Sequence, residues 1–117
     1  MKIPLCKPEA NEEMIDAASE ALRNERMVLG ESVFKFEEDF ADYIGTDFAV
    51  SVSSGTAALT LSLIALRAKG KEVLTTPLSF VATANSVVHA CASPSFVDVT
   101  EDEKLIDLSL TRGAVKN

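Results

Sequence analysis

The sequence is poor in several residue types, and each shortage argues against a kind of site. Among 117 residues there is no tryptophan and a single histidine, His89, which we assign to a helix end or the core. A cation in the last turn of a helix is favoured by the helix dipole. The two cysteines, Cys6 and Cys91, match no metal or redox spacing. We therefore expect them to be small buried hydrophobes in a reduced cytoplasm.

Positive charge is also scarce. Eleven Lys and Arg stand against 18 Asp and Glu, so the net charge is -7, and no basic run is present. Such a chain is a poor candidate for binding nucleic acid or an anionic membrane. We expect no signal peptide, because Pro4 and Pro8 follow Lys2 where an apolar core would be needed. The longest apolar stretch, 49–68, includes Arg67 and predicts a buried strand and helix instead of a membrane span.

Apolar spacing predicts two helices in the first part of the chain. The first begins after Asn11 as N-cap and stops near Asn24. The second begins near Ser32 and ends at Gly45 as a C′ residue. One face of this second helix is acidic: Glu37, Glu38, Asp39 and Asp42. We expect this face to be solvated, because a metal site needs more convergent ligands.

The middle of the chain alternates strands with helices. Strands are predicted near 48–52, 72–75 and 95–99, with helices at 56–68 and 80–90 between them. This alternation predicts an α/β fold with a mostly parallel sheet flanked by helices. Three strands make a thin sheet, so we expect an incomplete fold or one that another chain completes. Residues 1–117 are thus treated as a single partial domain, with N-terminal helices in 1–45, the alternating region in 46–99 and a tail in 100–117.

The segment 53–59, Ser-Ser-Gly-Thr-Ala-Ala-Leu, is the part of the chain that says most about chemistry. It follows a predicted strand and opens a helix, so it presents free backbone N–H groups and the positive end of a helix dipole. Gly55 lacks a β-carbon and Thr56 adds a hydroxyl, so an anion such as a phosphate can approach closely. The alternative is a turn that only caps the helix, and the motif by itself leaves both interpretations open.

A second distinctive position follows the next strand. Phe80 opens a predicted helix, and ligands gather at the carboxyl ends of strands in open α/β sheets. An aromatic ring beside a phosphate site suits a cofactor that has both a phosphate and a flat ring, as pyridoxal phosphate (PLP) does. Phe80 can equally be an ordinary core residue, which is the usual place of phenylalanine.

An ordered set of motifs runs through nearly the whole chain. It comprises Ile3-Pro4-Leu5, Leu29-Gly30, the helix Val33 to Ala41, Tyr43-Ile44-Gly45, Ser53 to Leu59, Phe80 to Asn85 and Pro94 to Val99. Any one of these is weak evidence, but in this order they resemble the N-terminal portion of the DegT/DnrJ/EryC1/StrS family of sugar aminotransferases. The resemblance covers essentially all of this chain and about the first third of a family member.

The resemblance implies a fold, a cofactor and site residues. The fold would be the N-terminal part of the large domain of an aspartate-aminotransferase-type (type I PLP) protein, which works as a homodimer. Gly55, Thr56 and Ala57 would hold the PLP phosphate, and Phe80 would stack on the pyridine ring. Leu29 and Gly30 would lie near the substrate. Family members transfer an amino group, commonly from glutamate, to a keto sugar attached to a nucleotide, in amino sugar, polysaccharide or lipopolysaccharide biosynthesis.

The family's covalent chemistry has no counterpart in these residues. In the family, the Schiff-base lysine and the aspartate that pairs with the pyridine nitrogen lie far downstream of this region. The lysines of this chain that could be confused with it, Lys69, Lys71, Lys104 and Lys116, occupy no matching positions. We therefore assign no catalytic residue and expect these 117 residues alone to be inactive.

Two other functions remain open at this point. The chain could be a non-catalytic truncated product or a partner subunit that docks onto a full-length paralogue, with its uncovered faces buried there. It could also be a small phosphate-binding module unrelated to transamination. The helix from Val33 to Ala41 favours the family over this last reading, since a phosphate site alone does not require it.

Overall fold

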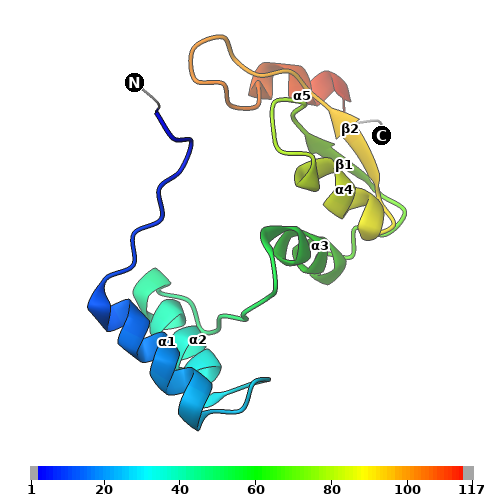
Figure 1. Cartoon of the computed structure of the whole chain (residues 1–117). Helices are drawn as coiled ribbons and strands as arrows, with labels where there is room; N and C mark the ends of the chain where they lie inside the picture. The colour runs from blue at the N-terminus through cyan, green and yellow to red at the C-terminus, as the bar shows by residue number, and fades with distance from the viewer. Residues whose placement is uncertain (1–2, 115–117) are drawn as a thin grey trace. The chain divides into compact units, whose positions relative to one another are not determined.

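Helices alternate with two short strands along residues 3–114, the part of the chain that this computed structural model describes (Figure 1). The elements are α1 (Glu12–Asn24), α2 (Glu31–Ile44), α3 (Gly55–Ala65), β1 (Glu72–Thr75), α4 (Ala82–His89), β2 (Ser93–Phe96) and α5 (Leu108–Ala114). The chain divides into two units, Met1–Ser51 and Val52–Asn117, and we describe each by itself.

The two helices of the first unit begin and end where the sequence predicts. The Asn11 side chain accepts a hydrogen bond from the Met14 N–H at 2.8 Å, which satisfies one of the unpaired donors at the start of α1. Gly45 ends α2 in the left-handed conformation, with φ of 79°, and its N–H donates to the Ala41 carbonyl at 2.8 Å. A residue with a β-carbon is disfavoured there, so glycine fits this helix end.

The second unit is built around a parallel strand pair joined through α4. β1 pairs with β2, with Glu72 opposite Ser93 and Thr75 opposite Phe96. Helix α4 connects the strands and packs on both of them and on α3. This arrangement confirms the α/β class and the parallel sheet with flanking helices.

The core of the second unit consists of small side chains. Its fully buried members are Ala68, Ser86, Val87, Ala90 and Val97. Ser86 is polar, but its hydroxyl donates to the Thr83 carbonyl at 2.8 Å, so its burial leaves no hydrogen bond unmade. Many larger apolar side chains of the described residues stay exposed, so this core is small for the apolar content of the chain.

The predicted strand at 48–52 does not form. A strand is stabilised by ladder hydrogen bonds to a neighbour, and within residues 3–114 this segment pairs with no other strand. Its backbone finds isolated partners instead, since the Ser51 N–H donates to a Glu37 carboxylate oxygen at 2.6 Å. That bond also corrects the expectation of a wholly solvated acidic face, because Glu37 is half-buried.

Other predicted boundaries shift. The last strand is β2 at Ser93–Phe96, two residues before the predicted 95–99, and Val99 forms only an isolated antiparallel bridge with Ile106. The helix predicted over 80–90 spans Ala82–His89, and the one over 56–68 spans Gly55–Ala65. Strand ends are set by pairing with a neighbour, which periodicity along one chain does not encode.

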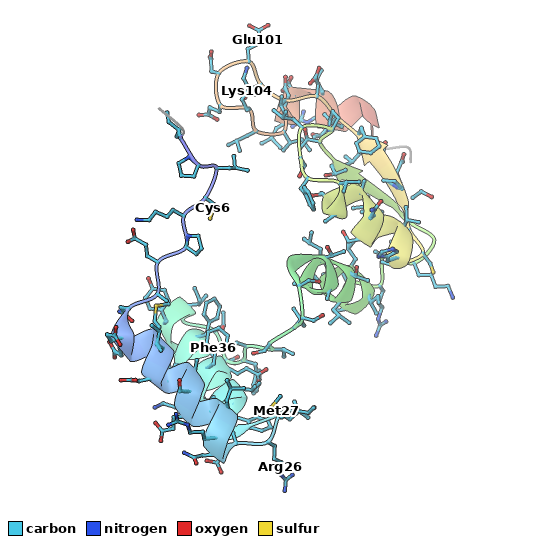
Figure 2. The ribbon with its side chains drawn as sticks, in the orientation of Figure 1. Cys6, Arg26, Met27, Phe36, Glu101 and Lys104 are labelled. Carbon is cyan, nitrogen blue, oxygen red and sulfur yellow. The ribbon has the colours of Figure 1, made fainter. Side chains whose placement is uncertain are left out.

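The expectation of buried cysteines is wrong. Cys6 lies exposed on the extended N-terminal segment that precedes α1 (Figure 2). Cys91 is also exposed, in the turn after α4, with φ of 57°. Cysteine is usually buried, but at both positions the path of the chain leaves the side chain exposed. His89 lies at the end of α4 and is exposed, so its predicted place at a helix end holds and a place in the core does not.

Val87 gives a direct test of this packing. It is 2% exposed, whereas Val88, the next residue of the same helix, is 56% exposed. Val87→Ala should lower the free energy of unfolding by about 2 kcal/mol, because it leaves a cavity between α4 and its neighbours. Val88→Ala is the matched control and should change it by less than about 0.5 kcal/mol. Urea denaturation followed by circular dichroism measures both, and equal losses would contradict the packing described.

Candidate anion and cofactor site

The start of α3 leaves backbone donors without partners. The Ser54 side chain accepts a hydrogen bond from the Ala57 N–H at 3.2 Å, so this serine caps the helix. Within the described residues, the N–H groups of Gly55 and Thr56 donate to no other residue. The predicted cap and the predicted free donors therefore occur together, with Ala57 satisfied internally and the two preceding N–H groups open.

The space in front of these donors is open. A β-carbon placed on Gly55 would meet no atom of the described residues within 4 Å beyond its own helix and chain neighbours. Thr56 is half-buried, and its hydroxyl forms no hydrogen bond among residues 3–114. Two N–H donors, one hydroxyl and a helix dipole make a donor set suited to an anion of phosphate size.

Phe80 is presented to solvent and is not part of the core. Its side chain is 78% exposed, and its carbonyl accepts from the Thr83 N–H at 3.0 Å as α4 begins. Phe80 and the Gly55 turn thus stand at the N-terminal ends of two helices, α4 and α3, that pack against each other. An exposed aromatic face is what stacking on a planar ring requires.

The predicted substrate residues lie in the first unit, in the connection between α1 and α2. Leu29 has φ of 54°, an uncommon value for a residue with a β-carbon, and its side chain is exposed. Gly30 is buried and is the N-cap of α2, where it offers no side chain to cap the helix. The acceptor comes instead from Glu25, whose carboxylate receives the Ser32 N–H at 3.0 Å.

The three lysines of the described residues that could be confused with the Schiff-base lysine lie in turns and loops, away from these positions in sequence. Lys69 and Lys71 belong to the connection between α3 and β1, and Lys104 lies in the loop after β2. Lys116 lies outside the described residues. Over the same residues, no group of three or more His, Cys, Asp or Glu is placed to hold a metal ion, and no helix is long and apolar enough to cross a bilayer.

Comparison with known proteins identifies the family. The DegT/DnrJ/EryC1/StrS aminotransferase family matches residues 8–117. The chain belongs to this family. The match includes the Gly55 turn, Phe80 and the Leu29-Gly30 connection, so all the predicted site residues fall inside it.

Curated relatives include a transaminase and a polysaccharide biosynthesis protein. A UDP-4-amino-4,6-dideoxy-N-acetyl-beta-L-altrosamine transaminase of Campylobacter jejuni is 43% identical over 103 residues, which cover 88% of this chain and 27% of that protein. The spore coat polysaccharide biosynthesis protein SpsC of Bacillus subtilis is 40% identical over 109 residues, which cover 90% of this chain and 27% of that protein. The chain therefore spans less than a third of the length of these relatives.

Solved structures show the same fold. A putative sugar aminotransferase from Streptococcus pneumoniae in its PLP form superposes with a TM-score of 0.91 at 28% identity, over 99% of this chain and 30% of that one. A GDP-4-keto-6-deoxymannose-3-dehydratase with bound PLP, from E. coli, superposes with a TM-score of 0.88 at 27% identity, over 99% of this chain and 32% of that one. The fold at this level is shared by transaminases and a dehydratase.

The Ser54 cap provides a test of the α3 start. Ser54→Ala should destabilise the second unit by about 1 kcal/mol, because the Ala57 N–H loses its acceptor. Ser53→Ala is the control, since Ser53 forms no hydrogen bond in the part of the chain described. Urea unfolding of both variants measures the difference, and a Ser53→Ala loss as large as that of Ser54→Ala would contradict the assigned cap.

Proposed function

We propose that this chain supplies cofactor-binding contacts for PLP-dependent amino transfer to nucleotide-linked keto sugars. The observation that carries the proposal is the open donor set of Gly55 and Thr56 within a sequence that matches an aminotransferase family over residues 8–117. The solved relatives include PLP and PMP forms of one sugar aminotransferase. Three of the four cofactor residues predicted from the sequence belong to this proposal, Gly55, Thr56 and Phe80, whereas the Ala57 N–H is already bonded to the Ser54 hydroxyl.

The chain's own residues would act by binding and orientation. The N–H groups of Gly55 and Thr56, with the Thr56 hydroxyl, would hold the phosphate, and the Ala57 N–H stays with Ser54. The exposed Phe80 ring would cover one face of the pyridine ring and fix its orientation. When bound, PLP supplies an electron sink for carbanion chemistry. No lysine of this chain is assigned the covalent role.

Amino transfer is supported by the curated relatives and by the description of the matching family. The transaminase of Campylobacter jejuni is 43% identical in sequence, and among the solved structures the sugar aminotransferase and the dehydratase are 28% and 27% identical. We propose that Leu29 and Gly30 lie near the sugar nucleotide, that the protein acts in the cytoplasm, and that a homodimer or a full-length paralogue completes it. The specific sugar and amino donor are not assigned.

Binding of PLP and of pyridoxal, which lacks the phosphate, tests the proposed site. We expect PLP to bind about ten-fold more tightly, because charge-assisted hydrogen bonds from Gly55 and Thr56 reach only the phosphate. Phe80→Ala should weaken PLP binding about five-fold through loss of ring stacking. Leu78→Ala is the control, because Leu78 is an exposed apolar residue of the same loop.

Absorbance titration of the purified chain measures these affinities. Equal affinity for PLP and pyridoxal would contradict the phosphate site, and so would an absence of PLP binding by the unaltered chain. An equal effect of Phe80→Ala and Leu78→Ala would contradict stacking on Phe80 while leaving the phosphate contacts in place.

A non-catalytic docking role is the second candidate, and α3 favours it. This helix is apolar on every side, yet none of its residues is buried, and Leu59, Leu61 and Ile64 are 43%, 51% and 53% exposed. A helix that is apolar all round belongs in a protein interior. Covering it requires more protein than residues 3–114 provide.

Association in solution tests this second role. Light scattering should report a species larger than a monomer, and Leu61→Glu should shift it toward the monomer by placing a charge on the apolar helix. Lys7→Glu changes the charge on the exposed N-terminal segment and should leave the association unchanged. A monomer at every concentration, with or without Leu61→Glu, would contradict obligate docking.

A further inference from the structure

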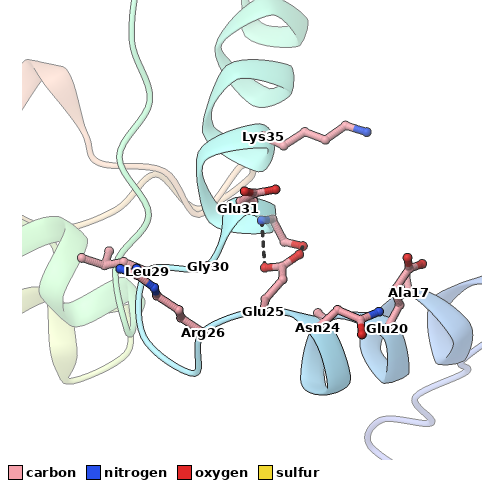
Figure 3. Close-up of a pocket in the computed structure, with 11 residues that line it drawn as sticks. Ala17, Glu20, Asn24, Glu25, Arg26, Leu29, Gly30, Glu31 and Lys35 are labelled. Carbon is pink, nitrogen blue, oxygen red and sulfur yellow. Dashed lines mark hydrogen bonds between the residues drawn. The ribbon is translucent and has the colours of Figure 1, made fainter.

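Helix α2 takes its N-terminal cap from a residue seven positions before the capped serine. Its N-cap, Gly30, makes no side-chain hydrogen bond. Glu25 supplies the acceptor: one carboxylate oxygen receives the Ser32 N–H at 3.0 Å, and the other receives the Ser32 hydroxyl. Figure 3 shows the Glu25 carboxylate below the first turn of α2, with the dashed bond between them. Both oxygens are therefore engaged by one residue.

The same residue also ends the preceding helix. Glu25 is the C-cap of α1, and its backbone N–H donates to the Ala21 carbonyl at 3.0 Å. Its backbone thus belongs to the end of α1, while its side chain holds the beginning of α2. The connection 26–30 is therefore fixed at both ends by a single residue.

Gly30 leaves the room that this contact needs. A β-carbon at position 30 would collide with the Glu25 carboxylate and would lie 3.1 Å from the Arg26 carbonyl. The neighbouring Leu29 is held at a positive φ of 54°, a conformation that persists where the surroundings over-determine it. The requirement for glycine here is steric, since the φ of Gly30 is an ordinary -68°.

The fixed connection presents apolar side chains outward. Met27, Val28 and Leu29 are 83%, 75% and 67% exposed, and Figure 2 shows Arg26 and Met27 projecting away from the helices. The hydrogen bonds of Glu25 fix the backbone of the connection, and the side chains of Met27, Val28 and Leu29 stay exposed. The positive end of α2 is already occupied by the protein's own carboxylate, so it is not free for a substrate phosphate.

We propose that Glu25 is a positioning residue that holds the Leu29-Gly30 connection in place by bridging the end of α1 and the start of α2. Its contribution to substrate binding rests on the proposed function, which places Leu29 and Gly30 beside the sugar nucleotide. The bridge itself stands on the hydrogen bonds of Glu25 alone.

The bridge requires the ionised carboxylate. The Ser32 hydroxyl and then the Ser32 N–H lower the pKa of Glu25 below its ordinary value of 4.5, with desolvation opposing them. The charged groups that line the same open pocket are Glu20, Arg26, Glu31 and Lys35. Because the folded-state pKa is depressed, the stabilisation is present above pH 4.5 and is lost as the pH falls through the lowered pKa.

Hydrogen exchange at the Ser32 amide tests the bridge. Glu25→Ala should speed this exchange about five-fold at pH 6, the ratio expected for loss of one helix cap. Glu25→Gln keeps one acceptor oxygen, so its Ser32 amide should exchange at a rate between those of the unaltered chain and Glu25→Ala. Glu20→Gln is the matched control, because Glu20 lines the same pocket and forms no side-chain hydrogen bond in the described residues. Unchanged exchange in both Glu25 variants would overturn the proposal.

A second measurement separates the bridge from the proposed function. UDP is titrated into the isotopically labelled chain while the Leu29 and Gly30 amide signals are followed. We expect shifts at both amides, with binding several-fold weaker in Glu25→Ala and unchanged in Glu20→Gln. If UDP moves neither signal but the Ser32 exchange changes as expected, the bridge holds and the substrate assignment fails. Equal UDP binding by Glu25→Ala and the unaltered chain would overturn the positioning role.

Discussion

The need of each helix start for hydrogen-bond acceptors organises this chain. The first N–H groups of a helix have no partner within it, so side chains, water or ligands must accept from them. Asn11 meets this need in part for α1, and Glu25 meets it in part for α2. Ser54 meets it only in part for α3, where Gly55 and Thr56 keep open donors. The start of α3 differs from the other two in having no acidic side chain in its first turn, where α1 has Glu12 and Glu13 and α2 has Glu31.

The small core of the second unit and the exposed apolar surface of α3 are two aspects of the same packing. The buried residues gather around α4 and the two strands, whereas α3 packs on α4 and leaves the rest of its apolar surface uncovered. The chain also spans less than a third of the relatives it matches. The site donors at the start of α3 therefore sit on a helix whose packing within residues 3–114 is one-sided.

Local sequence signals predicted the helices. The strands were harder to predict, because they depend on pairing with residues that are distant in the sequence. Asn11 and Gly45 mark their helix ends because a cap or a positive φ depends on a few adjacent residues. The strand at 48–52 could not be settled that way, since a strand exists only beside a partner. The Gly55 turn and Phe80 were predicted as site residues from motif and position, and the structure places them at the starts of α3 and α4. Glu25 was missed because it precedes the helix it caps by more than the usual cap spacing, although an N-cap glycine signals that an acceptor must come from elsewhere.

Because Gly30 and Glu25 are in contact, the effects of substitutions at these two positions depend on each other. An added methyl at position 30 meets the carboxylate of residue 25 first, and it also lies 3.1 Å from the Arg26 carbonyl oxygen and 3.2 Å from the Glu25 β-carbon. Substitutions in direct contact are not additive, so the effect of one depends on whether the other is already present. Shortening residue 25 removes the closest of the three contacts that alanine at position 30 would meet, and the other two stay. The order in which changes accumulate at these two sites therefore matters, and a survey of single substitutions would miss sequences that carry both.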